Sequence, residues 1–227
     1  MIKISRINVE GFEPAIRGMR NSHMSWDKSD SDFPDHGYYF EVGDADMELM
    51  LKLAKLGGSH AKFRRMIILW CDILAPLYWW KEFDTYKVGT VANSTSTMHS
   101  IADHKFTRDD FSCEHMFEAD TTGIPDHEEK ITGTVLGTII SSLNYARDEY
   151  IFAKEEGFEK QAKAYWWQMI QLLPSSYNQL RTVMVSYETL AHMHNDRKNH
   201  RLDEWRDFDR QLYYLPCHEI ITGDDGI

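Results

Sequence analysis

Apolar residues alternate with polar residues in some segments of the chain and recur at helical spacing in others. Residues 1–9 alternate Ile2, Ile4 and Ile7 with polar side chains, which predicts a β-strand. Residues 66–73 form a continuous apolar run with aromatic and β-branched side chains, and this run predicts a second, buried strand.

Helical spacing of apolar residues predicts most of the remaining structure. Residues 46–56 have this spacing and stop at Gly57 and Gly58, a favourable helix end. The other predicted helices cover 13–20, 131–154, 159–172, a segment with Leu180, Val183, Met184, Leu190 and Ala191 that follows a capping box at 176–179, and 203–215. Residues 21–35 and 99–129 lack periodicity, and we expect loops there.

Residues 75–98 change from aromatic to polar along their length. Pro76 opens a predicted helix crowded with aromatic side chains, whose density favours burial. Small hydroxyl and amide side chains end the segment: Asn93, Ser94, Thr95, Ser96 and Thr97. A polar turn after a buried helix often forms a ligand-facing edge, although an ordinary Ser/Thr loop gives the same pattern.

The composition is that of a globular protein with a substantial core. Of 227 residues, 42% are hydrophobic and 27% are charged, and neither repeats nor linkers interrupt the sequence. We therefore expect a single domain over residues 1–227. Its predicted class is α/β (α+β), with a small central sheet flanked by long helices.

Charge and cysteine usage narrow the partners and the compartment. The net charge of −11 disfavours binding to nucleic acid or to an anionic membrane. Three widely separated cysteines do not suit a disulfide framework or a structural zinc site. Neither a signal peptide nor a membrane-spanning apolar stretch is present in the sequence, so we expect a cytoplasmic protein.

The histidines and glycines exclude several common sites. His192 and His194 are two residues apart on a predicted helix, so we expect one to point inward and one outward rather than both to bind one metal. The zinc motif H-E-x-x-H is lacking, and we expect no metal site. The Gly-rich phosphate motifs of dinucleotide-binding folds and P-loops are also lacking.

Two groups of basic residues are candidates for anion binding. The first follows Gly57 and Gly58 and consists of His60, Lys62, Arg64 and Arg65. It either grips an anion or is the solvated start of a helix. The second candidate, Arg197, either satisfies carbonyls at a helix C-terminus or presents its planar fork to a phosphate or a pyrimidine edge.

In this order, these pieces resemble the flavin-dependent thymidylate synthases. That family has a glycine-histidine segment, an apolar strand and a helix that begins with Ala-Pro and leads into a signature R-H-R-x-x-S-x-N-x-x-S-x-R. The corresponding segments here are 58–65, 66–73 and the helix after Ala75 and Pro76. Further matches are Leu173-Pro174, Tyr177, Leu190 and Arg197, so that the resemblance spans about residues 48–206.

The signature itself differs from the family pattern. Aligned through Ala75 and Pro76, the R-H-R triplet becomes Thr85-Tyr86-Lys87, and a shift by one residue gives Tyr86-Lys87-Val88. The glutamine before the signature becomes Glu82, whereas the arginine beside the dUMP ring is retained as Arg197. Each lost arginine removes charge-assisted hydrogen bonds of about 1.5–3 kcal/mol to an anionic ligand.

The resemblance implies an enzyme that methylates dUMP at C5 with methylenetetrahydrofolate, using FAD that NADPH reduces. It implies flavin contacts from His60, Arg64, Lys87, Asn93 and His192. It implies nucleotide contacts from Glu82, Thr95, Ser96 and Arg197, with Arg197 as the catalytic residue. It also implies a homotetramer.

Two other functions are compatible with the sequence. The altered signature favours a non-enzymatic homologue or one of altered specificity, which binds a nucleotide or acts as an assembly protein. An unrelated helical interaction protein with an aromatic partner surface is the third alternative.

Overall fold

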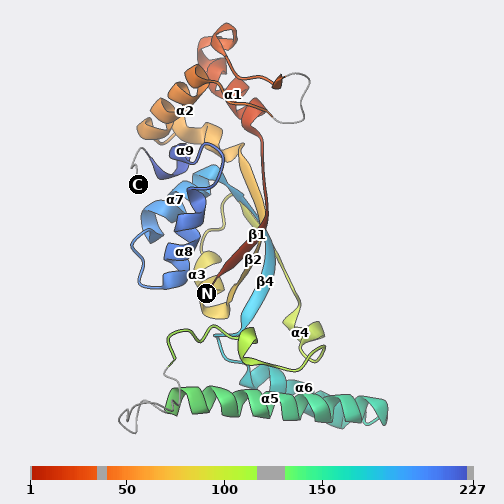
Figure 1. The fold of residues 1–227 in the computed structure, drawn as a ribbon. Coiled ribbons are helices and arrows are strands. Elements are labelled where there is room, and N and C mark those ends of the chain that lie inside the picture. The colour runs from red at the N-terminus through yellow and green to blue at the C-terminus, as the bar shows by residue number, and fades with distance from the viewer. Residues whose placement is uncertain (1, 35–39, 117–130, 224–227) are drawn as a thin grey trace. The chain divides into compact units, whose positions relative to one another are not determined.

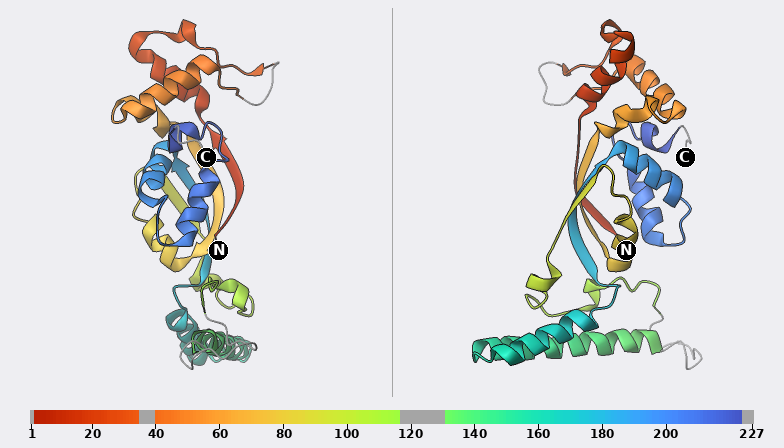
Figure 2. Two further views of the ribbon diagram at one scale, coloured as in Figure 1. Left: turned by 60° about the vertical axis from the view of Figure 1, so that its left-hand side comes forward. Right: turned by 180° about the vertical axis from the view of Figure 1, so that it is seen from behind.

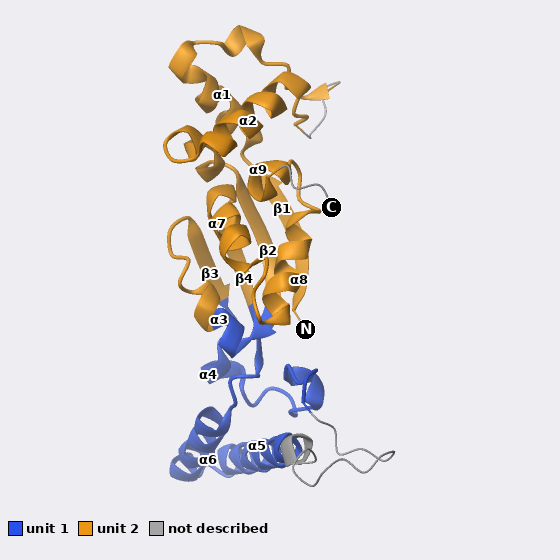
Figure 3. Cartoon of the chain, turned by 90° about the vertical axis from the view of Figure 1, so that its left-hand side faces the viewer, with its two compact units in different colours: residues 1, 74–80, 94–180 blue, residues 2–73, 81–93, 181–227 orange. Residues whose placement is uncertain are grey.

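A computed structural model of the chain describes residues 2–34, 40–116 and 131–223. The chain divides into two compact units, which Figure 3 colours separately. Unit 1 contains Leu74–Trp80 and Ser94–Leu180, and unit 2 contains Ile2–Ile73, Lys81–Asn93 and Arg181–Ile227. Whether residues 1–227 behave as a single domain stays a prediction.

Four strands form one sheet in the order β1-β2-β4-β3 (Figure 1). Their bounds are β1 (Lys3–Glu10), β2 (Ile68–Pro76), β3 (Thr90–Ser94) and β4 (Asn178–Ser186). The N–H of Tyr187 donates to the carbonyl of Ile67, and the N–H of Leu77 donates to that of Tyr177, so β2 and β4 run antiparallel. The strands predicted at 1–9 and 66–73 are confirmed as β1 and β2.

The two faces of β2 differ in the way that the alternation of side chains requires. Leu69, Cys71 and Ile73 are buried on one face. Asp72, on the other face, accepts a hydrogen bond of 2.6 Å from the Thr182 hydroxyl and forms an ion pair of 3.3 Å with Arg6. In Figures 1 and 2, α7 (Tyr187–Arg197) and α8 (Asp203–Leu212) lie on one face of this sheet.

The helices of unit 2 confirm the predictions for 13–20, 46–56 and 203–215. They are α1 (Phe12–Arg20), η1 (Asn21–His23), η2 (Trp26–Lys28), α2 (Asp44–Leu56), η4 (His60–Arg65), α7, α8 and α9 (Glu219–Thr222). The predicted stop after Leu56 is also present, because Gly57 caps α2 with a positive φ of 67°.

The carboxylate of Asp46 joins α1, α2 and the loop between them. It is fully buried and accepts hydrogen bonds from Arg20 Nε at 2.6 Å, from the Ser29 hydroxyl at 2.6 Å and from the Ser31 hydroxyl at 2.7 Å. Burial raises the pKa of this carboxyl, but the hydrogen bonds and the charge of Arg20 outweigh burial and lower it below 3.8. Asp46 is therefore ionised at neutral pH.

Unit 1 contains a pair of long helices that the sequence predicts correctly. α5 (Ile131–Glu155) and α6 (Glu159–Leu172) lie side by side in Figure 1. Leu143 and Met169 are buried between them, together with Phe106 and Phe111 from the preceding segment. That segment also contains α4 (Thr97–Ser100) and η5 (Arg108–Asp110).

The loop predicted for 99–129 is confirmed only in part. Residues 101–116 contain turns and the single 3-10 helix η5, as a helix-poor segment should. Residues 117–129 lie outside the described part of the chain. Among the described helices, none is long and apolar enough to cross a membrane.

The helix predicted after residues 176–179 is wrong over its first half. Residues 178–186 form β4, in which Gln179, Val183 and Val185 are buried, and α7 begins only at Tyr187. The side chain of Ser186 caps α7 by accepting from the N–H of Thr189 at 3.3 Å, in place of the predicted capping box. Short apolar runs with β-branched residues fit either period, and pairing with β2 and β3 selects the strand.

The polar turn predicted at the end of residues 75–98 is also wrong. α3 (Leu77–Phe83) begins one residue after Pro76, and its aromatic residues Trp79, Trp80 and Phe83 are buried as expected. The polar residues then form the edge strand β3 and the start of α4. The N–H of Ser186 donates to the carbonyl of Gly89, and the N–H of Thr95 donates to the carbonyl of Leu180, so hydrogen bonds to β4 hold both ends of this segment.

Candidate functional site

Arg197, the last residue of α7, contacts the C-terminal part of α3 and the turn that follows it. Its Nη1 donates to Glu82 Oε2 at 2.8 Å, and its Nε donates to the Tyr86 hydroxyl at 3.0 Å. The guanidinium also lies 4.9 Å from the centre of the Trp205 ring, within cation–π distance. The structure thus brings together Glu82 and Arg197, two of the predicted nucleotide-binding residues.

The carboxylate of Glu82 accepts more than one hydrogen bond. Trp205 Nε1 donates to Oε2 at 2.9 Å, and His200 Nε2 lies 3.4 Å from the same oxygen. His200 Nε2 also lies 3.0 Å from Arg197 Nη1, and His200 Nδ1 accepts from the N–H of Leu202 at 3.2 Å. Arg197 and Trp205 therefore both donate hydrogen bonds to Glu82.

Nearby carboxylates offset the positive charge of Arg197. Glu82 pairs with Nη1, and Asp196 accepts a hydrogen bond of 3.1 Å from the same Tyr86 hydroxyl that Arg197 contacts. Burial raises the pKa of Tyr86, so this hydroxyl is protonated at neutral pH. Of the three guanidinium nitrogens of Arg197, only Nη2 makes no hydrogen bond with the described residues. It is the donor left for a ligand.

Sequence reasoning did not identify Trp205 and His200 as parts of this cluster. They lie on α8 and in the turn before it, more than 110 residues from Glu82 along the chain. The available signal was a tryptophan within the strongly charged stretch 200–207, since an aromatic residue there is usually buried.

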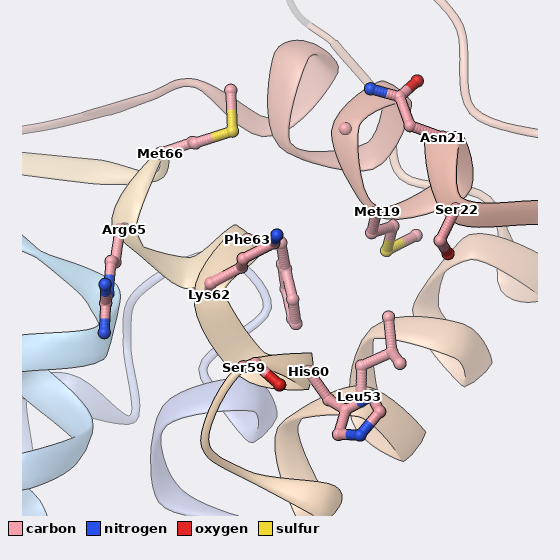
Figure 4. A pocket seen from close by; sticks show the side chains of 11 residues that line it. Met19, Asn21, Ser22, Leu53, Ser59, His60, Lys62, Phe63, Arg65 and Met66 are labelled. Atoms are coloured by element: carbon pink, nitrogen blue, oxygen red, sulfur yellow. The ribbon is translucent and has the colours of Figure 1, made fainter.

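A pocket of about 700 Å³ lies between α1, η1, α2 and η4, all in unit 2. Figure 4 shows His60, Lys62 and Phe63 on η4, Leu53 on α2, and Met19, Asn21 and Ser22 on the side of α1 and η1. Apolar and basic side chains line the pocket, and none of its described lining residues is acidic. We call it the basic pocket.

Two basic side chains of the basic pocket, His60 and Lys62, are available to a ligand. Arg65 is not one of them, because its Nε donates to Glu188, which raises the pKa of Arg65. The side chains of His60 and Lys62 are exposed and form neither a hydrogen bond nor an ion pair with the described residues. With the apolar rings and chains of Phe63, Leu53 and Met19, they suit a ligand that combines an anion with a flat apolar group.

The other predicted flavin contacts lie outside the basic pocket. Arg64 lines a different pocket, with α9 and α7. Lys87, Asn93 and His192 are exposed in the turn before β3, on β3 and on α7. None of the three lines the basic pocket.

The remaining predicted nucleotide contacts use their polar groups locally within unit 1. The hydroxyl of Thr95 donates to the carbonyl of Leu180 at 3.2 Å. The hydroxyl of Ser96 lies 2.7 Å from His99 Nδ1. Both side chains are nevertheless exposed.

The histidines of α7 point in opposite directions, as predicted. His192 is exposed, whereas His194 is buried, with Nδ1 2.8 Å from Asp209 Oδ1. The described residues contain no group of three or more His, Cys, Asp or Glu that could hold a metal. Burial raises the pKa of Cys71 to about 12 and that of Cys217 to about 11, so both are unreactive thiols at neutral pH.

No protein-family model matches the chain, and no curated protein sequence matches it either. Solved structures do match. Thymidylate synthase X (ThyX) from Helicobacter pylori, in complex with FAD and dUMP, has a TM-score of 0.63 and 13% sequence identity over 99% of this chain and 98% of its own. The UMP/dUMP methylase PolB from Streptomyces cacaoi, bound with 5-Br dUMP, has a TM-score of 0.57 and 14% identity over 98% and 95%.

The chain therefore has the fold of these nucleotide methylases over its whole length. The predicted resemblance to flavin-dependent thymidylate synthases, and the predicted fold class, are confirmed at the level of the fold. At 13–14% identity, the likeness extends to the fold alone.

Proposed function

We propose that this protein is a divergent thymidylate synthase-like enzyme that binds FAD in the basic pocket and methylates a uracil nucleotide such as dUMP at C5. The observation that supports this most is the basic pocket itself, which presents His60 and Lys62 without an acidic lining residue in a chain of net charge −11. A protein of the same fold binds FAD and dUMP.

The residues present fit a flavin nucleotide in two respects. His60 and Lys62 would contact its pyrophosphate, and the charge of Lys62 complements that of the anion. Phe63, Leu53 and Met19 supply the apolar surface that a flat ring needs. When bound, the flavin supplies the redox chemistry of the methyl transfer, with methylenetetrahydrofolate as carbon donor and NADPH as reductant.

Arg197 would act on the nucleotide through Nη2, the guanidinium nitrogen that has no hydrogen-bond partner among the described residues. Glu82 and Tyr86 fix the orientation of the guanidinium, so Nη2 is preorganised to donate to a pyrimidine carbonyl. A donor at that carbonyl stabilises negative charge that develops on the ring during substitution at C5. Contacts from Lys87, Asn93 and His192 to the flavin, and from Thr95 and Ser96 to the nucleotide, stay predictions.

The arrangement around Arg197 also favours a second candidate function, a nucleotide-binding homologue without methylase activity. Glu82 already neutralises the retained arginine, and an incoming phosphate would have to compete with that carboxylate. Such a protein would bind a uracil nucleotide weakly and leave it unchanged.

One spectroscopic experiment separates these functions. The purified protein is titrated with FAD, its visible absorbance is recorded, and dUMP and methylenetetrahydrofolate are then added to the reduced protein. Flavin uptake followed by reoxidation that depends on both compounds supports the enzyme. No uptake at micromolar FAD contradicts it, and a melting temperature that still rises with dUMP supports the second function.

A further inference from the structure

A second pocket of unit 2 carries an excess of positive charge. It encloses about 470 Å³ between α2, η4, α7 and α9. Its basic lining residues are Lys52, Lys55 and Arg64, and Glu219 is the one acidic residue among its described lining. Three cations against one carboxylate are unusual on a chain whose net charge is −11.

The guanidinium of Arg64 makes fewer hydrogen bonds with the described residues than it has donors for. Its Nη1 donates to the carbonyl of Ile220 at 3.0 Å, whereas its buried Nε has no hydrogen-bond partner among the described residues. Burial lowers the pKa of Arg64, and the charge of Glu188 opposes this effect. The guanidinium remains charged at neutral pH, because arginine does not lose its proton in proteins.

Among the described residues, no carboxylate forms an ion pair with Arg64. The carboxylate of Glu188 is hydrogen-bonded to Arg65. Glu219 lies 3.9 Å from His218 Nε2, and it forms an ion pair with that ring when the ring is protonated. A half-buried guanidinium whose described partner is one carbonyl is costly, and an external anion would remove the cost.

The two lysines add to the same site. Lys52 and Lys55 are three residues apart on α2, so their side chains lie on one face of the helix. We propose that this pocket binds a small dianion, namely a phosphate group carried by a metabolite. Two lysines beside an arginine match a phosphate, which has two charges and several acceptor oxygens. They match a ligand with a single carboxylate less well.

This phosphate pocket is separate from the basic pocket. The two share none of their described lining residues, although both include residues of α2 and η4. Sequence reasoning placed His60 and Arg64 together on one flavin, whereas in the structure they line different pockets. The phosphate pocket therefore does not depend on the proposed methylase function.

Isothermal titration of the full-length chain with pyrophosphate and with inorganic phosphate, at low ionic strength, tests the proposal. We expect saturable binding that weakens with added salt, and weaker binding of succinate. Arg64→Gln should weaken pyrophosphate binding about 10- to 100-fold, the effect of one lost charge-assisted hydrogen bond. Arg210→Gln, which removes an exposed arginine paired with Asp207, is the matched control and should bind as the wild type does.

Two further variants keep the test decisive. Lys52→Gln combined with Lys55→Gln changes exposed side chains, so it should fold even if Arg64→Gln does not, and it should also weaken binding. Lys81→Gln changes an exposed lysine of α3 that lines neither pocket, and it should bind pyrophosphate as the wild type does. The proposal is wrong if wild-type protein binds neither phosphate, or if Arg64→Gln and the lysine pair variant bind pyrophosphate as tightly as the wild type does.

Discussion

Arg197 is a cation whose charge the protein has already paired. Glu82 accepts a hydrogen bond from its Nη1, Tyr86 accepts one from its Nε, and the Trp205 ring lies against the face of the guanidinium. The sequence shows the substitution at Glu82 but not its consequence, because the other partners lie on a different helix. At the scale of the residue, the pattern selected Glu82 and Arg197, and only the fold revealed that their charges offset one another.

The Glu82–Arg197 pair should weaken the binding of an anionic nucleotide. Glu82→Gln keeps a hydrogen-bond acceptor near Arg197 but removes the negative charge. That charge, 2.8 Å from Arg197, repels the anionic nucleotide and offsets the attraction of Arg197 for it. We expect the variant to bind dUMP about tenfold more tightly than the wild type, a gain of about 1.4 kcal/mol. Isothermal titration with dUMP measures this directly.

A control substitution separates the local effect from the change in net charge. Asp84→Asn makes the same charge change a short distance along the chain, where Asp84 pairs with Arg181 at 2.8 Å. It should leave the affinity for dUMP within about twofold of the wild type, since exposed charges are screened by solvent. Equal or weaker binding by Glu82→Gln would show that Glu82 does not limit nucleotide affinity.

At the scale of the element, segments whose apolar residues fit one type of structure were predicted correctly. Segments that fit both a helix and a strand were not. The long helices α5 and α6 follow from sustained helical spacing, and β2 follows from its continuous apolar run. β4 does not, because Leu180, Val183 and Met184 also fit a helix, and only pairing with β2 and β3 decides. β3 escaped prediction because an edge strand with exposed polar residues has no hydrophobic alternation.

The carboxylate of Asp46 should make stability depend on acid pH. Its folded-state pKa lies below the unfolded value near 3.8, so its contribution is present above that value and is lost as pH falls through the folded-state pKa. Asp46→Asn should reduce the free energy of unfolding by about 3–5 kcal/mol at pH 7, because it leaves buried Arg20 without its counter-ion. Urea unfolding from pH 7 to pH 2.5 measures the difference, which should shrink toward the acid end; a constant difference would contradict the role of the charge.

Gly11 should be more sensitive to substitution than another glycine with a positive φ. Its φ is 101°, and an added Cβ would lie 2.1 Å from the carbonyl oxygen of Met66, a backbone atom that cannot easily move. We expect Gly11→Ala to destabilise the protein by at least about 3 kcal/mol, from strain and overpacking together. Gly58→Ala is the control, because Gly58 also has a positive φ (54°) but no neighbouring atom within 4 Å, and it should cost about 1–2 kcal/mol. Equal losses in thermal unfolding would show that the contact with Met66 relaxes.

At the scale of the whole molecule, the order of the elements was more informative than any single motif. The succession of a glycine-histidine segment, an apolar strand and an aromatic helix predicted a fold that the chain shares with known nucleotide methylases at 13–14% identity. The positions of the cations were less predictable. His60 and Arg64 are four residues apart on η4 and line different pockets, because the three residues per turn of a 3-10 helix put them on different faces.

The predicted homotetramer is testable through the exposed aromatic residues of unit 1. Tyr145 and Phe152 are seven residues apart on one face of α5 and are 62% and 55% exposed. If this face is part of the interface, light scattering should give four times the 26.6 kDa chain mass for the wild type and a lower mass for Tyr145→Lys combined with Phe152→Lys. Glu155→Lys, at the end of the same helix, should not change the mass. A monomeric wild type would refute the tetramer, and an unchanged mass of the double variant would place the interface elsewhere.

The most direct measurement is the affinity of the protein for FAD with and without the Lys62 cation of the basic pocket. Titration followed by flavin absorbance should give micromolar binding to the wild type and about 10- to 100-fold weaker binding to Lys62→Gln, which loses one charge-assisted contact. Lys81→Gln, an equivalent loss of charge on α3 outside the pocket, should bind FAD as the wild type does. No FAD uptake by the wild type, or equal affinities for wild type and Lys62→Gln, would contradict a flavin in this pocket.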